Sequence, residues 1–289
     1  MELRVLRYFL AVVAEGNISN AAQQLHISQP TISRQLKELE EELGVTLFRR
    51  GNKSIELTDR GRYLAHQANQ LLTLSDKTVD NIRQTEQIDG SVYIGSGEFK
   101  MMLTLGQAIK ALQESYPDVL FNIKSTNSIE VHEKLQSGIF DFGVVMDPTD
   151  KTDYEYLTLK GESRWGLLVP NSASLAKQDY IIPADLENAN LIVSQQSGSS
   201  DQIGYWLGES LENYHVVATY NLLYNASQLV SSGVGYAIGI DGIINTNQSE
   251  LTFVPLKPRL TAGVSLVWMK GRPLSPAARV FLDQLRKAN

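Results

Sequence analysis

Residues 26–44 read HISQPTISRQLKELEEELG, and this stretch decides the N-terminal part of the fold. Ser28 is a favoured N-cap residue, and Pro30 follows just inside the helix start, where its missing N–H costs nothing. Gly44 is a natural helix end. Between them apolar residues recur at spacings of four, three and four, and we expect the helix to bury these side chains: Ile32, Leu36, Leu39 and Leu43.

Two shorter helices are predicted upstream of this one. Residues 19–26, SNAAQQLH, are small or helix-favouring, and Ser19 can cap their helix. An earlier helix ends at Gly16 and carries apolar residues at helical spacing: Leu3, Leu6, Leu10 and Val13. Two helices joined by a short turn have the spacing of a helix-turn-helix, although such corners are also common in protein cores.

The helix within 26–44 presents a polar face opposite its leucines. That face carries Gln29, Ser33, Arg34 and Lys37, and Thr31 flanks it. Gln and Arg can form bidentate contacts to adenine and guanine edges, whereas Ser and Thr reach phosphates or bases. The pattern favours DNA binding; the alternative is a solvated amphipathic helix with ordinary surface charges.

A hairpin follows in residues 47–58, LFRRGNKSIELT, because Gly51-Asn52 stands between two apolar pairs. Its tip adds three cations suited to the phosphate backbone: Arg49, Arg50 and Lys53. Residues 1–60 hold eight Lys/Arg and eight Asp/Glu, while the whole 289-residue chain has a net charge of −6. Such a chain would not coat nucleic acid indiscriminately, so DNA binding requires a locally basic face.

The glutamates in the second half of 26–44 indicate which end of the helix approaches DNA. They can pair at i, i+4 with Arg34 and Lys37, and elsewhere phosphate would repel them. The polar front turn, SQPTISRQ, is therefore the end expected in a groove.

Residues 58–87 predict one long helix with a single narrow apolar stripe: Leu64, Ala68, Leu71, Ser75, Val79 and Ile82. These positions alternate by three and four, which favours a seam with a second copy of the chain. The alternative is packing against the chain's own globular domain.

Beyond Asp89-Gly90 short apolar runs alternate with helical stretches, which predicts an α/β architecture with mostly parallel central strands. About 200 residues exceed what one small α/β layer needs, so we expect two subdomains. The chain contains no cysteine, which excludes disulfides, thiolate metal sites and cysteine nucleophiles.

Residues 19–61 resemble the N-terminal signature of the LysR-type transcriptional regulators. The resemblance rests on AA-x-x-L-H, SQPT-x-S, the L-E-x-x-L-G run, LF-x-R and LT-x-x-G, and the downstream layout agrees along the whole chain. It implies a winged helix-turn-helix at 1–58, a linker and dimerisation helix at 59–88, and an effector-binding domain at 89–289. The predicted wing, RRGNKSI, is shorter than is common in that family.

The resemblance also implies how the N-terminal residues act. The helix from Ser28 would enter the major groove of promoter DNA, and two subunits would address an inverted repeat. Tetramers are common in the family, and RNA polymerase is a candidate partner. The residues assigned to DNA are Ser19, Ser28, Gln29, Pro30, Thr31, Ser33, Arg34, Lys37, Arg50 and Lys53.

In this family the C-terminal domain resembles a type II periplasmic binding protein, with a small effector between two α/β lobes. Lobe I would span about 91–161 and 263–289, and lobe II about 162–262. Ligands in such folds bind at the carboxyl ends of strands. The expected effector residues are Ser96, Gly97, Glu98, Phe99, Thr126, Asn127, Ser128, Met146 with Asp147, Ser194, Gln195, Gln196, Asn225, and Ile240 with Asp241.

Two of these residues have a structural alternative. Asn127 with Glu130 fits an N-cap pair, so Asn127 serves either the helix or the effector. Glu98 either points into the cleft or caps the helix that follows it. In the cleft, its charge would favour a neutral or cationic effector, or one bound through Lys100.

Enzymatic functions find little support in the sequence. The four histidines are isolated, no Gly-x-Ser-x-Gly elbow occurs, and GVGYAIG at 233–239 is a stray glycine pair. We expect a cytoplasmic regulator without a cofactor. The runner-up is a solute-binding protein or an enzyme with an accessory helical domain, which the N-terminal sequence argues against because it lacks a full signal peptide.

Overall fold

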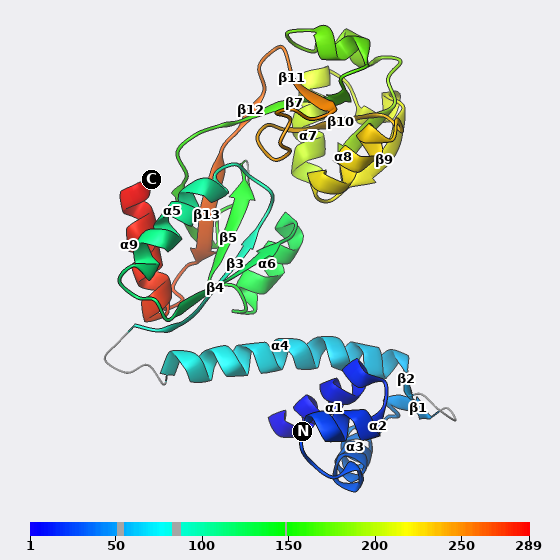
Figure 1. Ribbon diagram of the computed structural model, residues 1–289, viewed down its shortest axis with the longest axis vertical. Helices are drawn as coiled ribbons and strands as arrows, with labels where there is room; N and C mark the ends of the chain where they lie inside the picture. Colours follow the sequence, from blue (N-terminus) through cyan, green and yellow to red (C-terminus); the bar gives the residue numbers. More distant parts are fainter. Residues whose placement is uncertain (51–54, 83–87, 148) are drawn as a thin grey trace. The chain divides into compact units, whose positions relative to one another are not determined.

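The structure is a computed structural model that describes residues 1–50, 55–82, 88–147 and 149–289 (Figure 1). The chain divides into two compact units, Met1–Arg83 and Gln84–Asn289. Each unit has its own hydrophobic core, and each is described by itself below.

The described residues of the first unit form four helices and a two-stranded hairpin. The elements are α1 (Leu3–Glu15), α2 (Ile18–Gln24), α3 (Gln29–Leu43), β1 (Phe48–Arg50), β2 (Ile55–Leu57) and α4 (Asp59–Ile82). Strands β1 and β2 pair antiparallel, as the sequence predicts, whereas Gly51, Asn52 and Lys53 lie outside the described residues. One face of each of the first three helices packs into the core of this unit. The core includes Val5, Phe9, Val12, Ala21, Ile32, Leu36 and Leu39.

Helix ends follow the predicted signals, with one exception. Gly16 and Gly44 end α1 and α3 in the left-handed conformation, and the Ser28 hydroxyl accepts the backbone N–H of Thr31. The prediction for α2 was wrong: its N-cap is Asn17, whose side chain accepts the N–H of Ser19. An Asx cap two residues before the expected position satisfies the same free N–H groups.

The buried faces also differ in detail from the predicted ones. Leu43 is 38% exposed, because α3 ends there and the chain turns away at Gly44. In α1, Leu6 of the predicted stripe is buried and Leu10 and Val13 are partly buried, whereas Leu3 is exposed. Val5, Phe9 and Val12 form the rest of the core side.

Helix α4 packs along α1 within the same unit. Ala68 and Leu72 are buried against Leu6, and Arg7 forms an ion pair with Asp76. Ala68 therefore faces the chain's own helix, and Leu64 is partly buried beside it. In contrast, three other members of the predicted seam remain exposed: Leu71, Val79 and Ile82.

The second unit contains two sheets. The first has the strand order β4-β3-β5-β13-β6 and is built from β3 (Gly90–Ser96), β4 (Val119–Ser125), β5 (Phe142–Met146), β6 (Tyr154–Thr158) and β13 (Val264–Met269). Helices α5 (Met102–Gln113) and α9 (Pro276–Ala288) cover one face, and α6 (Ser128–Gln136) covers the other.

The second sheet has the order β11-β7-β10-β8-β9, with short β12 beside β7. Its strands are β7 (Ser163–Pro170), β8 (Leu191–Ser194), β9 (Val216–Tyr220), β10 (Tyr236–Ile240), β11 (Leu251–Pro255) and β12 (Thr261–Ala262). Helix α7 (Ser197–Leu207) packs on one face and α8 (Leu223–Ser231) on the other. Three 3-10 turns complete the lobe: η1 (Ser174–Lys177), η2 (Pro183–Leu186) and η3 (Leu211–Asn213).

The expected parallel pairing holds for three strands in each sheet. Strands β4, β3 and β5 are mutually parallel neighbours, as are β9, β8 and β10, because helices connect them. Strands β13, β6, β7 and β11 take part in antiparallel pairs. In the described part of the chain no helix is long and apolar enough to cross a membrane.

Candidate functional site

The start of α3 forms a polar, accessible surface on the first unit. Most of the side chains predicted to contact DNA are exposed here, and Thr31 and Ser33 are partly buried; the exposed ones are Ser28, Gln29, Pro30, Arg34 and Lys37. The Ser28 and Thr31 hydroxyl oxygens lie 2.7 Å apart, so these two side chains support each other at the helix start. The sequence prediction therefore placed a coherent set of donors and acceptors on one surface.

The basic residues of α3 are held only loosely. Arg34 Nε lies 3.6 Å from Glu38 Oε1, and Lys37 Nζ lies 3.4 Å from Glu41 Oε1, which confirms the expected i, i+4 pairing. All four side chains are more than half exposed. Exposed pairs of this type contribute roughly 0.3–0.5 kcal/mol, so either cation can exchange its glutamate for a phosphate.

Two features of this unit were missed from the sequence. His26, in the turn between α2 and α3, has φ 54°, a left-handed conformation uncommon for a residue with a side chain. Glu40 Oε1 accepts the N–H groups of Leu47 and Phe48 at 2.6 and 3.2 Å. One acidic residue of α3 thus fixes the entry to the hairpin, and this contact joins the helix to β1.

The remaining predicted DNA residues lie around this helix. Ser19 is exposed in the first turn of α2, Arg49 is exposed on β1, and Arg50 ends β1 opposite Ile55. Lys53 lies outside the described residues.

A pocket of about 450 Å3, including the part open to solvent, lies between the two sheets of the second unit. Both lobes contribute to it: the β3–α5 loop and the end of β5 on one side, and the ends of β8, β9 and β10 on the other. The lining residues are Gly97, Glu98, Phe99, Met146, Trp165, Ser194, Gln196, Tyr220, Asn221, Leu222, Leu223, Ile240 and Ile243.

Several expected ligand residues line this pocket, namely Gly97, Glu98, Phe99, Met146, Ser194, Gln196 and Ile240. Trp165, Tyr220, Asn221, Leu222, Leu223 and Ile243 were missed. Tyr220 ends the third parallel strand of its sheet, so the rule that selected Ser194 would also have found it. Trp165 lies on an antiparallel strand, to which that rule does not apply.

Other expected ligand residues lie outside the pocket. Asn127 caps α6 by accepting the N–H of Glu130 at 2.9 Å, and Ser128 opens that helix. Thr126 donates its hydroxyl hydrogen to the Glu130 carboxylate, which Lys124 also contacts. These hydrogen bonds, the one from Lys124 first, lower the pKa of Glu130.

The remaining expected ligand residues also lie outside the pocket lining, and most of them form hydrogen bonds or ion pairs within the protein. Ser96 is buried and donates to the Gly97 carbonyl at 2.6 Å. Gln195 is exposed and donates to Thr219 Oγ1 at 3.0 Å, and Asn225 is exposed on α8. Asp147 pairs with Lys151 at 2.6 Å.

Glu98 contacts the opposite lobe directly. Its Oε2 accepts the backbone N–H of Leu223, the first residue of α8, at 2.6 Å. The N-cap residue of α8 is Leu222, which offers no side-chain acceptor. Glu98 therefore lines the pocket and also caps a helix, but the helix is α8 across the pocket rather than α5, which follows Glu98 in sequence.

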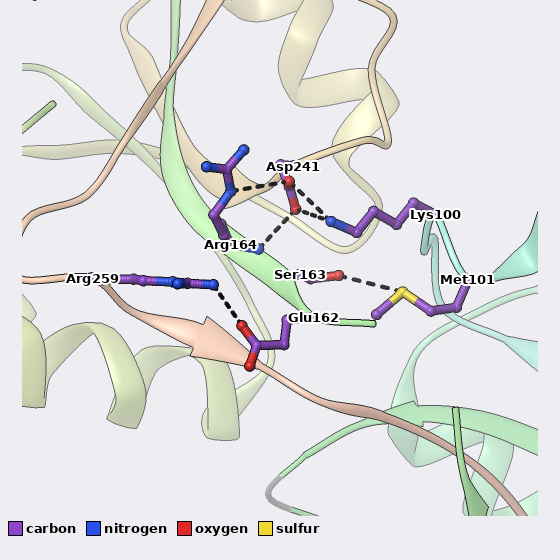
Figure 2. A network of polar contacts seen from close by, with 7 residues as sticks. All are labelled: Lys100, Met101, Glu162, Ser163, Arg164, Asp241 and Arg259. Atoms are coloured by element: carbon purple, nitrogen blue, oxygen red, sulfur yellow. Dashed lines mark hydrogen bonds and ion pairs between the residues drawn. The ribbon is translucent and has the colours of Figure 1, made fainter. Parts of the chain in front are cut away.

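A second polar contact joins the lobes beside the pocket (Figure 2). Lys100 Nζ lies 3.1 and 3.0 Å from the two carboxylate oxygens of Asp241, which follows β10. Asp241 also accepts the backbone N–H of Arg164 at 2.8 Å. The adjacent pair of Glu162 and Arg259 is much more exposed. Lys100 is therefore held by a carboxylate of the other lobe.

Tyr220 contributes a ring to the pocket but not an ionisable group. Its hydroxyl donates to the Ile238 carbonyl at 2.7 Å. Burial of the hydroxyl, followed by the nearby charge of Glu98, strongly raises the pKa of Tyr220. No cluster of three or more potential metal ligands occurs among the described residues.

Comparison with known proteins matches both units to described families. Residues 3–62 match the bacterial regulatory helix-turn-helix protein model of the lysR family, and residues 85–289 match the LysR substrate binding domain. The chain is 28% identical over 287 residues to the Hca operon transcriptional activator HcaR of Escherichia coli, covering 98% of this chain and 96% of HcaR. It is 35% identical over 301 residues to the regulator ClcR of Pseudomonas putida, covering 99% and 98%.

Solved structures agree with the fold. CbnR complexed with its target DNA has a TM-score of 0.78 at 24% identity, and each chain is covered completely. HinK, a LysR family regulator from Pseudomonas aeruginosa, has a TM-score of 0.57 at 25% identity, covering 99% of this chain and 98% of HinK. These relatives are transcriptional regulators and not enzymes. The chain belongs to the LysR family of bacterial transcriptional regulators.

Proposed function

We propose that this regulator binds inverted-repeat promoter DNA as a dimer or larger homo-oligomer, and that a small molecule between its two C-terminal lobes modulates this binding. The single observation that carries the proposal is the pocket, which both lobes line and which polar contacts between the lobes bridge. A ligand that enters it changes the contacts of both lobes at once. Such differential contact is what a ligand needs to shift a conformational equilibrium.

Support for DNA recognition comes from the first turns of α3. Gln29 and Arg34 are exposed there beside the Ser28 hydroxyl, and the neighbouring hairpin carries Arg49. We assign base reading to the first turns of α3 and contact with the phosphate backbone to the hairpin. Loss of a base reader weakens specific binding and relaxes sequence preference, whereas loss of a phosphate contact weakens all sequences similarly.

A mobility shift on the DNA upstream of the regulator's own gene and on adjacent promoters tests this division. Arg34→Ala should weaken specific binding by about 1–3 kcal/mol and relax base preference. Lys53→Ala should lower the affinity for specific and random DNA alike. Equal behaviour of the two variants contradicts the division, and the absence of salt-sensitive, sequence-specific binding contradicts DNA recognition itself.

Oligomerisation is proposed through the outer face of α4. Leu71, Val79 and Ile82 are exposed there, whereas Ala68 is occupied by α1 and is left out of the proposed seam. Val79→Glu should shift the molecular mass measured by light scattering toward the monomer and weaken binding to a two-half-site DNA. Asp80→Asn, a charge change on the same helix turn, serves as the control.

Effector binding is tested by thermal shift against a metabolite library. A ligand of the folded protein raises the melting temperature by mass action. The hit must then change the DNA affinity of the full-length protein. Replacing Ile240, which lines the pocket, with Trp should remove both effects.

A further inference from the structure

The pocket between the lobes has an unusual charge balance. Among the lining residues that the structure describes, Glu98 is the single carboxylate, and none is Lys, Arg or His. The hydroxyl of Tyr220, the other titratable group, is neutral and already donates to a carbonyl. An anionic ligand would thus meet one negative charge and no cation in this pocket.

Glu98 has one oxygen available to a ligand. Oε2 accepts the Leu223 N–H, and no described residue donates a hydrogen bond to Oε1. Nor does a described Lys or Arg form an ion pair with Glu98, because nearby Lys100 is held by Asp241. The side chain is only partly buried and lines the pocket, so this charge is presented to whatever enters.

Three aromatic rings line the same space as Glu98, those of Phe99, Trp165 and Tyr220. The Phe99 ring lies against the Gly97 backbone, where an added Cβ would come within 2.7 Å of it. The Trp165 indole is 3% exposed, and its N–H donates to Gln202 Oε1 at 3.1 Å. The faces of such rings carry negative electrostatic potential and attract cations.

We propose that the effector of this regulator carries a compact cationic group, a primary or quaternary ammonium, attached to an apolar portion. This inference rests on the proposed function. The cation would sit at Glu98 Oε1 against the aromatic rings, while Met146, Ile240 and Ile243 cover the apolar portion. A carboxylate effector would instead have to displace Glu98 from the start of α8.

Three test compounds that share one phenyl ring separate the charge classes: benzyltrimethylammonium, benzyl alcohol and benzoate. Isothermal titration of the full-length protein at pH 7 should show benzyltrimethylammonium binding at least about tenfold more tightly than benzoate. Benzyl alcohol should fall between them.

The variant Glu98→Gln removes the charge but keeps a carbonyl oxygen for the Leu223 N–H. It should lower the affinity for benzyltrimethylammonium by about tenfold and leave that for benzyl alcohol unchanged. Glu162→Gln is the matched control, because it removes one carboxylate from an exposed pair outside this pocket. Circular dichroism verifies that both variants are folded.

The inference is overturned if benzoate binds more tightly than the cation, if the cation does not bind, or if the two Gln variants behave alike. Benzoate binding that Ile240→Trp abolishes would overturn the cationic assignment while leaving the ligand-binding role in place. If no compound in the metabolite library changes DNA affinity, the proposed function fails and the inference fails with it.

Discussion

The contact between Lys100 and Asp241 should contribute measurably to the stability of the second unit. Lys100 is 34% exposed and Asp241 15% exposed, so solvent screens the pair only in part. Hydrogen bonds to charged groups contribute about 1.5–3 kcal/mol, and the exposure of Lys100 reduces this to about 1–2 kcal/mol. For a unit of this size, that corresponds to about 2–8 °C in melting temperature.

The perturbation is Lys100→Met, which keeps an unbranched side chain shorter by one atom and removes its charge. Arg259→Met is the matched control in the same network, because Arg259 and Glu162 are 68% and 57% exposed. Exposed pairs contribute at most about 1 kcal/mol. Calorimetry of the full-length variants should therefore show a clearly larger loss for Lys100→Met.

A double-mutant cycle isolates the pair itself. Asp241→Asn keeps an oxygen for the Arg164 N–H, so the double variant Lys100→Met/Asp241→Asn should be less destabilised than the sum of the single variants. Equal losses for Lys100→Met and Arg259→Met, or strict additivity in the cycle, would refute the reasoning that partial burial makes this contact stronger.

Three further predictions concern single residues. Glu40→Ala leaves the Leu47 and Phe48 N–H groups without their acceptor and should destabilise the first unit by about 1–3 kcal/mol in denaturant titration, with Glu42→Ala as an exposed control on the same helix. Gly61→Ala places a Cβ 2.2 Å from the Leu47 carbonyl oxygen, so this variant should destabilise the first unit and weaken DNA binding. The control Gly106→Ala places its Cβ in open space and should leave both properties unchanged. Glu130 has a lowered pKa in the folded chain, so its stabilising contribution is present above the unfolded pKa and is lost as the pH falls through the folded pKa. The difference in the free energy of unfolding between wild type and Glu130→Gln should therefore shrink as the pH falls below 4.5, the ordinary pKa of this carboxyl, and a constant difference would contradict this.

Local signals in the sequence predicted most of the secondary structure. Ser28, Gly16 and Gly44 act within one helical turn, so their roles follow from neighbouring residues alone. The same applies to the hairpin and to the helix-connected parallel strands. Strand β6 does not follow from this pattern, because its sequence, YEYLT, has only one buried residue and no apolar run.

Contacts between distant segments could not be predicted in this way. Glu40 accepts backbone N–H groups seven and eight residues later, and Glu98 caps a helix 125 residues away. The rule that ligands bind at strand ends found half of the pocket. It missed Leu222 and Leu223, which lie at the start of α8. They line the pocket because of how the two lobes face each other, which local sequence does not reveal.

The cap that Glu98 supplies to α8 has a consequence for building chimaeras between relatives. A chimaera that exchanges one lobe by cutting the chain where it passes between the lobes separates α8 from its acceptor, Glu98. If the incoming helix begins with its own Ser or Asp, that side chain and Glu98 compete for one backbone N–H. If it begins with Leu, as here, a foreign β3–α5 loop that lacks the glutamate leaves this N–H unsatisfied. The β3–α5 loop and the first turn of α8 therefore depend on each other, and a chimaera must take both from the same parent.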